Sequence, residues 1–156
     1  MPKNYGKAFE RKLKEDFLKI EGSTIDRLYD PTSGFHSISN VCDFIGYIFP
    51  NIFYLECKSH NGNTFPLKNL TQFDKLKEKI GIPGVRAGVV LWFVEHKKVI
   101  YIPISTFVKL NEDGEKSFNI KMLGSDKYFS LEIPGNVKRL FIDSDYSVLK
   151  NLEDGQ

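Results

Sequence analysis

Two carboxylates and one ammonium group interrupt an otherwise apolar stretch of the chain. The stretch, residues 42–60, reads CDFIGYIFPNIFYLECKSH, and its charged members before the final His are Asp43, Glu56 and Lys58. Such groups are costly in a buried sheet unless they are paired or bind an ion. The two acids outnumber the lysine, and carboxylate oxygens beside a basic group are the donors that Mg²⁺ or Mn²⁺ uses when it also holds phosphate. This composition favours phosphodiester chemistry.

The same stretch is expected to form a hairpin of two strands. Residue types that favour strands run over 41–49 and 52–59, and Pro50 and Asn51 between them suit a tight turn. A two-residue turn fixes which residues face each other across a hairpin. The two faces can therefore be derived from the sequence.

Alternation along these strands gathers the charged groups on one face. Residues two apart face the same way, so Glu56 and Lys58 share a face. The expected pairing sets Asp43 opposite Lys58 and diagonal to Glu56, with Cα atoms ~7–8 Å apart, so that one cation fits between the acids. Cys42 and Cys57 are expected on the reverse face as free, buried thiols. The alternative is an ordinary salt-bridge cluster on an exposed hairpin.

The expected metal site has three kinds of donor. Asp43 and Glu56 would hold the ion, with the backbone carbonyl of Cys57 and water completing an octahedron. Lys58 would neutralise charge that develops on the phosphate or orient the attacking water. Glu10, in the first expected helix, would reach the site as a further ligand.

Hydrophobic periodicity elsewhere predicts a mixed α/β sheet with helices packed on it. Helices are expected over residues 5–20 and 67–81. Their apolar stripes are Phe9, Leu13, Phe17 and Ile20 in the first and Leu70, Phe73, Leu76 and Ile80 in the second. Further strands are expected over residues 24–30, 85–95 and 98–104. The run 85–95 is continuously apolar, which predicts a central strand, and a helix capped by Ser105 and several short strands follow it.

At 156 residues the chain has the length of one domain. We expect a single domain over residues 1–156, with its core at about 5–107, short strands and a helix over 108–150, and a flexible tail at 151–156. No signal peptide and no apolar run long enough to span a membrane are visible, so a cytoplasmic location is expected.

Basic residues are in local excess although the net charge is only +2. Residues 1–20 hold six Lys or Arg against three acids, and residues 61–80 hold four Lys against two acids. Either segment fits a surface for DNA, and a solvated helix face is the alternative explanation. The residues expected to contact DNA are Lys7, Arg11, His36, His60 and Lys68.

Four segments follow one another in a recognisable order: GKAFE, CDFIGY, LECKSHNGNTFPLKNLTQFDKL and YIPISTF. In this order and at these spacings they resemble the RecU-type Holliday junction resolvases, in which a helical Glu, a T-D-[FY]-x-G strand, an E-x-K strand, a T-x-F-P-L loop and a helical Gln occur. The resemblance covers about residues 5–107, and DGEKSFNI at about 113–120 resembles a further segment of that family.

The resemblance implies a restriction-endonuclease-like fold of the PD-(D/E)xK nuclease superfamily, with a mixed central sheet flanked by helices. It implies that Glu10, Asp43 and Glu56 are the metal-binding acids, Lys58 the catalytic lysine and Gln72 a helix glutamine near the active site. It also implies a homodimer that uses Mg²⁺ or Mn²⁺ to make paired, symmetric nicks in four-way DNA junctions during recombination and repair. The implied source is a bacterial cell or a phage that infects one.

One segment departs from the family pattern. Residues 30–42, DPTSGFHSISNVC, are short and contain no Lys or Arg, whereas the cellular resolvases carry a longer basic stalk there. A less selective or sequence-specific nuclease on the same fold is therefore an alternative. A DNA-binding or junction-binding module without catalysis is an alternative from another class, and an α/β domain with an incidental ion-pair cluster is a third.

Overall fold

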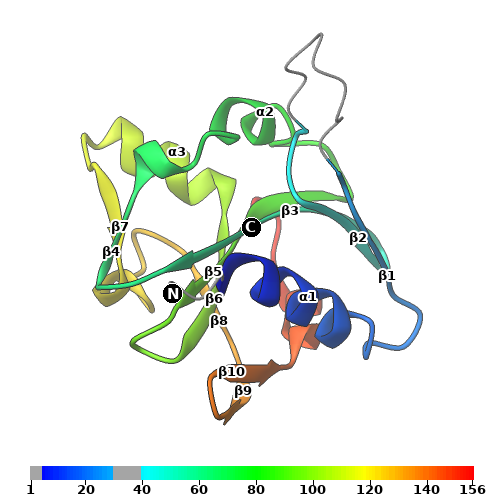
Figure 1. The fold of residues 1–156 in the computed structure, drawn as a ribbon. Helices are drawn as coiled ribbons and strands as arrows, with labels where there is room; N and C mark the ends of the chain where they lie inside the picture. Colours follow the sequence, from blue (N-terminus) through cyan, green and yellow to red (C-terminus); the bar gives the residue numbers. More distant parts are fainter. Residues whose placement is uncertain (1–4, 30–39) are drawn as a thin grey trace, which may run out of the picture.

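The computed structural model describes residues 5–29 and 40–156. Its centre is a six-stranded sheet with the strand order β1-β2-β3-β5-β6-β8 (Figure 1). The strands are β1 (Thr24–Arg27), β2 (Phe44–Ile48), β3 (Asn51–His60), β5 (Val85–Phe93), β6 (Lys98–Pro103) and β8 (Leu131–Ile133). The pairing of β3 with β5 is parallel and the other four pairings are antiparallel. The predicted mixed α/β sheet is confirmed.

In the part of the chain that the structure describes, two small sheets and three helices surround the centre. Strand β4 (Thr64–Pro66) pairs with β7 (Ser117–Asn119), and β9 (Gly135–Lys138) pairs with β10 (Phe141–Ser144). The helices are α1 (Tyr5–Phe17), α2 (Phe73–Lys77) and α3 (Ile104–Glu112), and short 3₁₀ turns cover Leu67–Asn69, Ile120–Met122 and Tyr146–Asn151.

Each face of the central sheet carries its own hydrophobic core. Helix α1 packs its predicted stripe on one face, over Phe53 and Trp92. Helices α2 and α3 pack on the other, over Val89 and Leu91 (Figure 1). Strand β5 supplies both cores, and its residues from Ala87 to Phe93 are all buried. The prediction of a central strand buried on both sides is therefore confirmed.

Helix α1 approaches the sheet closely at one glycine. A side-chain carbon added at Gly46 of β2 would lie 2.9 Å from the ring of Phe17, so only glycine admits the ring there. The helix ends at Phe17 rather than at the predicted Ile20, but Ile20 is buried as the stripe requires.

The second predicted helix is wrong in extent. In place of one helix over 67–81 there is a 3₁₀ turn, a break at Leu70 with ψ 80°, and the short helix α2. Asn69 and Thr71 flank the break, and both are weak helix formers. Ile80, predicted to lie on the buried stripe, falls beyond α2 and is 42% exposed. Leu70 and Leu76 both pack in the core although no continuous helix joins them.

The predicted cap of the third helix is also wrong. Helix α3 begins at Ile104 after Pro103, and no side chain caps it. The Ser105 hydroxyl instead donates to the carbonyl of Gly155 at 2.8 Å. The tail 151–156, expected to be flexible, thus lies against the start of α3.

A buried carboxylate fastens α1 to the C-terminal hairpin. Asp16 is only 2% exposed and accepts hydrogen bonds from Lys12 at 3.0 Å, Lys19 at 2.9 Å and the backbone N–H of Ser144 at 2.9 Å. Lys12 also pairs with Asp143 on β10. Because the same helix carries Glu10, these contacts fix where that residue lies.

We predict that Asp16→Asn lowers the free energy of unfolding by about 2–3 kcal/mol, because two charge-assisted hydrogen bonds are lost from a buried position. Urea unfolding with an unchanged m-value measures the effect. The exposed neighbour Glu15 supplies the matched control, since Glu15→Gln should change stability by less than about 0.5 kcal/mol. Equal effects of the two substitutions would contradict a fastening role for Asp16.

Candidate active site

The turn of the β2–β3 hairpin lies one residue earlier than predicted. Phe49 and Pro50 form it, so Asn51 pairs with Ile48 and opens β3. The cross-strand pairing is thereby displaced by two residues from the expected one. An even displacement leaves every side chain of the strands on its predicted face.

Asp43 and Glu56 lie close together at the start of the hairpin. Phe44, the first residue of β2, pairs with Leu55. Asp43 immediately precedes β2, and its carboxylate is near enough to Glu56 to raise the pKa of that residue. One carboxylate oxygen of Asp43 accepts a hydrogen bond of 2.9 Å from the backbone N–H of Cys57. This bond locks the Asp43 carboxylate against β3.

The two cysteines do not share a face, which corrects the prediction for Cys42. Cys57 packs in the core beneath α1, whereas Cys42 lies in the core of the opposite face with Leu76. Cys42 precedes β2, where strand alternation no longer applies. Both thiols are free, as predicted, and burial raises the pKa of Cys42 to about 12.

Glu56 is a buried acid whose carboxylate is only partly satisfied by hydrogen bonds and nearby charges. It is 2% exposed, and its Oε2 has no hydrogen-bond partner in the structure. Lys58 lies beside it, with Nζ 3.7 Å from Oε1. Burial, followed by the neighbouring carboxylate of Asp43, raises the pKa of Glu56 to about 8, against the opposing charges of Lys58 and Arg27. A cation placed at Oε2 would supply the missing partner.

Arg27, at the end of β1, joins the site and was not predicted. Its Nε lies 3.1 Å from Glu10 Oε2, and a terminal nitrogen lies 3.5 Å from Asp43 Oδ1. Burial lowers the pKa of Arg27. The nearby carboxylates of Glu10 and Asp43 raise it by more, so the net shift of this pKa is upward. The sequence feature that could have indicated Arg27 is a single arginine in β1, the strand that pairs with β2 just after Asp43.

The residues present fit a divalent cation with two carboxylate ligands. Asp43 and Glu56 lie together beside the backbone of Cys57, and the orphan oxygen of Glu56 needs a partner. Within residues 5–29 and 40–156, no three side chains of His, Cys, Asp or Glu are grouped to hold a metal ion. The third predicted acid, Glu10, is bound by Arg27 instead.

Gln72 lies outside this group of contacts. It immediately precedes α2, and its side-chain oxygen accepts a hydrogen bond of 3.0 Å from Thr71. His36 falls outside the described residues.

The remaining residues predicted to contact DNA occupy three elements. Lys7 and Arg11 are exposed on α1, and Lys68 is exposed on the 3₁₀ turn after β4. His60 ends β3 on the same face as Lys58, with its ring 5.8 Å from Phe65 and 6.2 Å from Phe93. His60 therefore lies next to Lys58 along the same face of β3, and its imidazole is held by packing against two aromatic rings.

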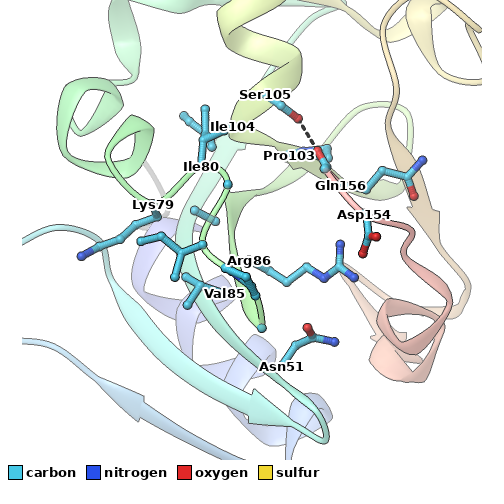
Figure 2. A pocket seen from close by; sticks show the side chains of 16 residues that line it. Asn51, Lys79, Ile80, Val85, Arg86, Pro103, Ile104, Ser105, Asp154 and Gln156 are labelled. Atoms are coloured by element: carbon cyan, nitrogen blue, oxygen red, sulfur yellow. Dashed lines mark hydrogen bonds between the residues drawn. The ribbon is translucent and has the colours of Figure 1, made fainter.

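A separate cavity of about 330 Å³ opens at the other end of β3. Figure 2 shows Lys79, Arg86 and Ser105 around it, with Arg86 directed toward the end of the chain. Arg86 donates to the carbonyls of Leu152 and Glu153. Neither Asp43 nor Glu56 lines this cavity, so it is distinct from the carboxylate site.

The fold of the chain is restriction-endonuclease-like. The structure of Hjc, a Holliday junction resolvase from the archaeal hyperthermophile Archaeoglobus fulgidus, has the same fold, with a TM-score of 0.56 at 20% identity over 81% of this chain and 95% of that one. The family model "RecU: Recombination protein U" matches residues 12–142. The chain belongs to the recombination protein U family.

No curated protein matches the chain in sequence. In the described part of the chain, none of the helices is long and apolar enough to cross a membrane.

We predict that the metal-free protein loses stability as pH rises from about 5 to 8. A carboxyl whose folded pKa, about 8, lies above its unfolded value binds more protons when folded, so its stabilising effect is complete below the unfolded pKa of ~4.3 and disappears through pH 8. The slope is at most about 1.4 kcal/mol per pH unit. Urea unfolding in EDTA at several pH values measures it.

Glu56→Gln should remove this part of the pH dependence, because the amide does not titrate. The control is the exposed Glu95, whose replacement by Gln should leave the parent's slope in place. Identical profiles for the parent and Glu56→Gln would show that Glu56 is ionised in the folded protein across this range.

Proposed function

We propose that the protein is a Holliday junction resolvase that makes paired nicks in four-way DNA junctions with Mg²⁺ or Mn²⁺. The observation that carries the proposal is the pair of neighbouring carboxylates, Asp43 and Glu56, with Lys58 beside Glu56, in a chain of the recombination protein U family. The resolvase named in the comparison, Hjc, shares the fold. We propose that the protein acts on junctions in the cytoplasm of a bacterial cell. The protein would be encoded either by that cell or by a phage that infects it.

The proposed roles follow from the contacts of the site. Asp43 and Glu56 would be the side-chain metal ligands, with the carbonyl of Cys57 between them. The bound ion would polarise the phosphodiester and lower the pKa of a water molecule. Lys58, 3.7 Å from Glu56, would carry a positive charge to the phosphate oxygens, where negative charge grows in the transition state.

Other side chains would guide the DNA to the site. Lys7 and Arg11 on α1 and Lys68 after β4 are exposed cations, and His60 extends the functional face of β3. Such contacts neutralise phosphates and make affinity fall with salt. Gln72 would act near the site from its position just before α2.

An exposed apolar face supports the homodimer. On the face of the hairpin that carries Glu56, Phe49 is 77% exposed and Ile52 is 40% exposed, next to the half-buried Tyr47 and Tyr54. Contiguous apolar surface of this kind marks interaction sites, and a two-fold dimer would present two sites to a two-fold junction.

A less selective nuclease is the second candidate function. It is favoured by residues 30–42, which hold no Lys or Arg where the cellular resolvases carry a basic stalk. Parallel digestion of a four-way junction, a flap and a linear duplex separates the two functions. Preferential, symmetric nicking of the junction supports the resolvase, and equal cleavage of all three supports the second candidate.

We predict that Asp43→Asn lowers the rate of junction cleavage in Mg²⁺ by at least about 100-fold, because a charged ligand and its electrostatic effect are lost. Junction binding should change little, since the affinity comes from contacts to many phosphates. Single-turnover cleavage and a gel-shift titration measure the two effects. Mn²⁺ should raise the melting temperature of the parent but not that of the variant.

The control for this prediction is Asp26→Asn, which removes an exposed carboxylate from β1. It should cleave at the parent's rate. A parent protein that binds junctions but cuts none with any divalent ion would instead establish the non-catalytic binding module.

We predict that Ile52→Glu shifts the protein from dimer to monomer, because a charge would be buried in the apolar interface. Sedimentation equilibrium at micromolar concentration measures the shift. Leu18→Glu is the matched control, since Leu18 is similarly exposed at 47% but lies after α1 on the other side of the sheet. A monomeric parent, or a dimer that survives Ile52→Glu, would contradict this interface.

A further inference from the structure

Arg27 is the contact that joins the acid of α1 to the acid of the β2–β3 hairpin. Its Nε is 3.1 Å from Glu10 Oε2, and its terminal nitrogen is 3.5 Å from Asp43 Oδ1. One guanidinium thus binds two of the three acids expected to act on a metal. The third, Glu56, has no hydrogen-bond partner for its Oε2.

The guanidinium is anchored by its backbone contacts and remains reachable from solvent. It donates to the carbonyls of Leu28 and Asp43 and lies over the rings of Tyr29 at 5.7 Å and Phe44 at 5.5 Å. Its side chain is 23% exposed. A new anionic partner can therefore reach Arg27 while these contacts hold it in place.

The ion pair with Arg27 keeps Glu10 away from any metal. Arg27 holds Oε2 of Glu10 through a hydrogen bond of 3.1 Å, closer than its 3.5 Å contact with Asp43, so Glu10 is the weaker metal ligand of the two while this pair lasts. In the described part of the chain, no group of three ligating side chains exists. The free protein accordingly offers a divalent ion two carboxylates rather than three.

A DNA phosphate is the group that can exchange with Glu10. The forked guanidinium binds phosphate and carboxylate with the same geometry. The three acids of the site face only two cations, Arg27 and Lys58, which leaves one negative charge in excess when all are ionised. A phosphodiester alone would add to that excess, whereas a phosphodiester together with a divalent ion would neutralise it.

We infer that Arg27 couples DNA binding to metal binding. In the free protein it holds Glu10, and when a phosphate takes its place on the guanidinium, Glu10 becomes available to the metal ion. DNA then raises the affinity for the ion, and by linkage the ion raises the affinity for DNA equally. The inference rests on the proposed function and adds a positioning role for Arg27 within it.

The test measures metal affinity rather than activity. Calorimetric titration with Ca²⁺, with and without a synthetic four-way junction and after subtraction of Ca²⁺ binding to the junction alone, gives the coupling. For the parent, the junction should tighten Ca²⁺ binding about tenfold. For Arg27→Gln, free protein should bind Ca²⁺ more tightly than the parent does, and the junction should change that affinity by less than about twofold.

Two further variants make the result specific. Glu10→Gln should keep the parent's Ca²⁺ affinity in free protein and lose the gain from the junction, and it tests the inference even where Arg27→Gln does not fold. Lys98→Gln, which removes one cation from an exposed pair with Glu132 at 2.7 Å, should keep the full coupling. It controls for net charge.

Three outcomes would overturn the inference: no coupling in the parent, undiminished coupling in Arg27→Gln, or weaker Ca²⁺ binding by free Arg27→Gln than by the parent. The proposed function fails in a different experiment. Loss of that function would appear as absence of Asp43-dependent junction cleavage by the parent in Mg²⁺, whereas a protein that cleaves without coupling would refute only the role of Arg27.

Discussion

The placement of Glu56 beside Asp43 is the constraint on which the rest of this structure depends. Two carboxylates lie close together at the start of a hairpin, and one of them is almost fully buried with an oxygen that no group of the described residues satisfies. In water these groups would separate. Here the backbone N–H of Cys57 on β3 fixes the orientation of Asp43. The positive charges of Lys58 and Arg27 offset part of the repulsion between the two carboxylates. Protonation of Glu56, whose pKa is raised to about 8, offsets a further part.

A rigid scaffold is required to maintain such an arrangement. Strand β3 carries Glu56 and Lys58, and it is paired along its length with β5, the strand buried on both faces. Helix α1 is held by aromatic contacts to Trp92 at its start and by Asp16 at its end. Sites supported by central strands open only with global unfolding. Glu56 and Lys58 therefore lie on one of the elements least able to relax.

The sequence predicted the faces of β2 and β3 because an even error in register leaves strand alternation unchanged. The turn was placed one residue too late, yet the register changed by two, so the side chains within the two strands, Glu56 and Lys58 among them, stayed on their predicted faces. The prediction for Cys42 failed because that residue lies outside the strand. The long second helix failed because packing of Leu70 and Leu76 overrides the helical spacing of the apolar residues.

Arg27 could not be predicted from local pattern. Its partners Glu10 and Asp43 lie 17 and 16 positions away in the chain, and the three meet only when α1, β1 and β2 pack together. A sequence identifies residue types able to bind metal, but the cation that occupies one of them in the folded state is a tertiary property. For this reason Glu10 pairs with Arg27 in the folded chain, although the sequence suggested it as a third metal ligand.

The charge of the site also determines where DNA selectivity must arise. With Glu56 protonated in the metal-free site, two ionised acids balance two cations, so the carboxylate cluster does not itself attract a phosphate backbone. Attraction must then come from exposed cations outside the cluster, such as Arg11 and Lys68, and these recognise phosphates without regard to branching. A preference for four-way junctions therefore requires something that the cluster lacks, namely a fixed spacing between two sites. The exposed apolar face of the β2–β3 hairpin is the surface on which that spacing would be set.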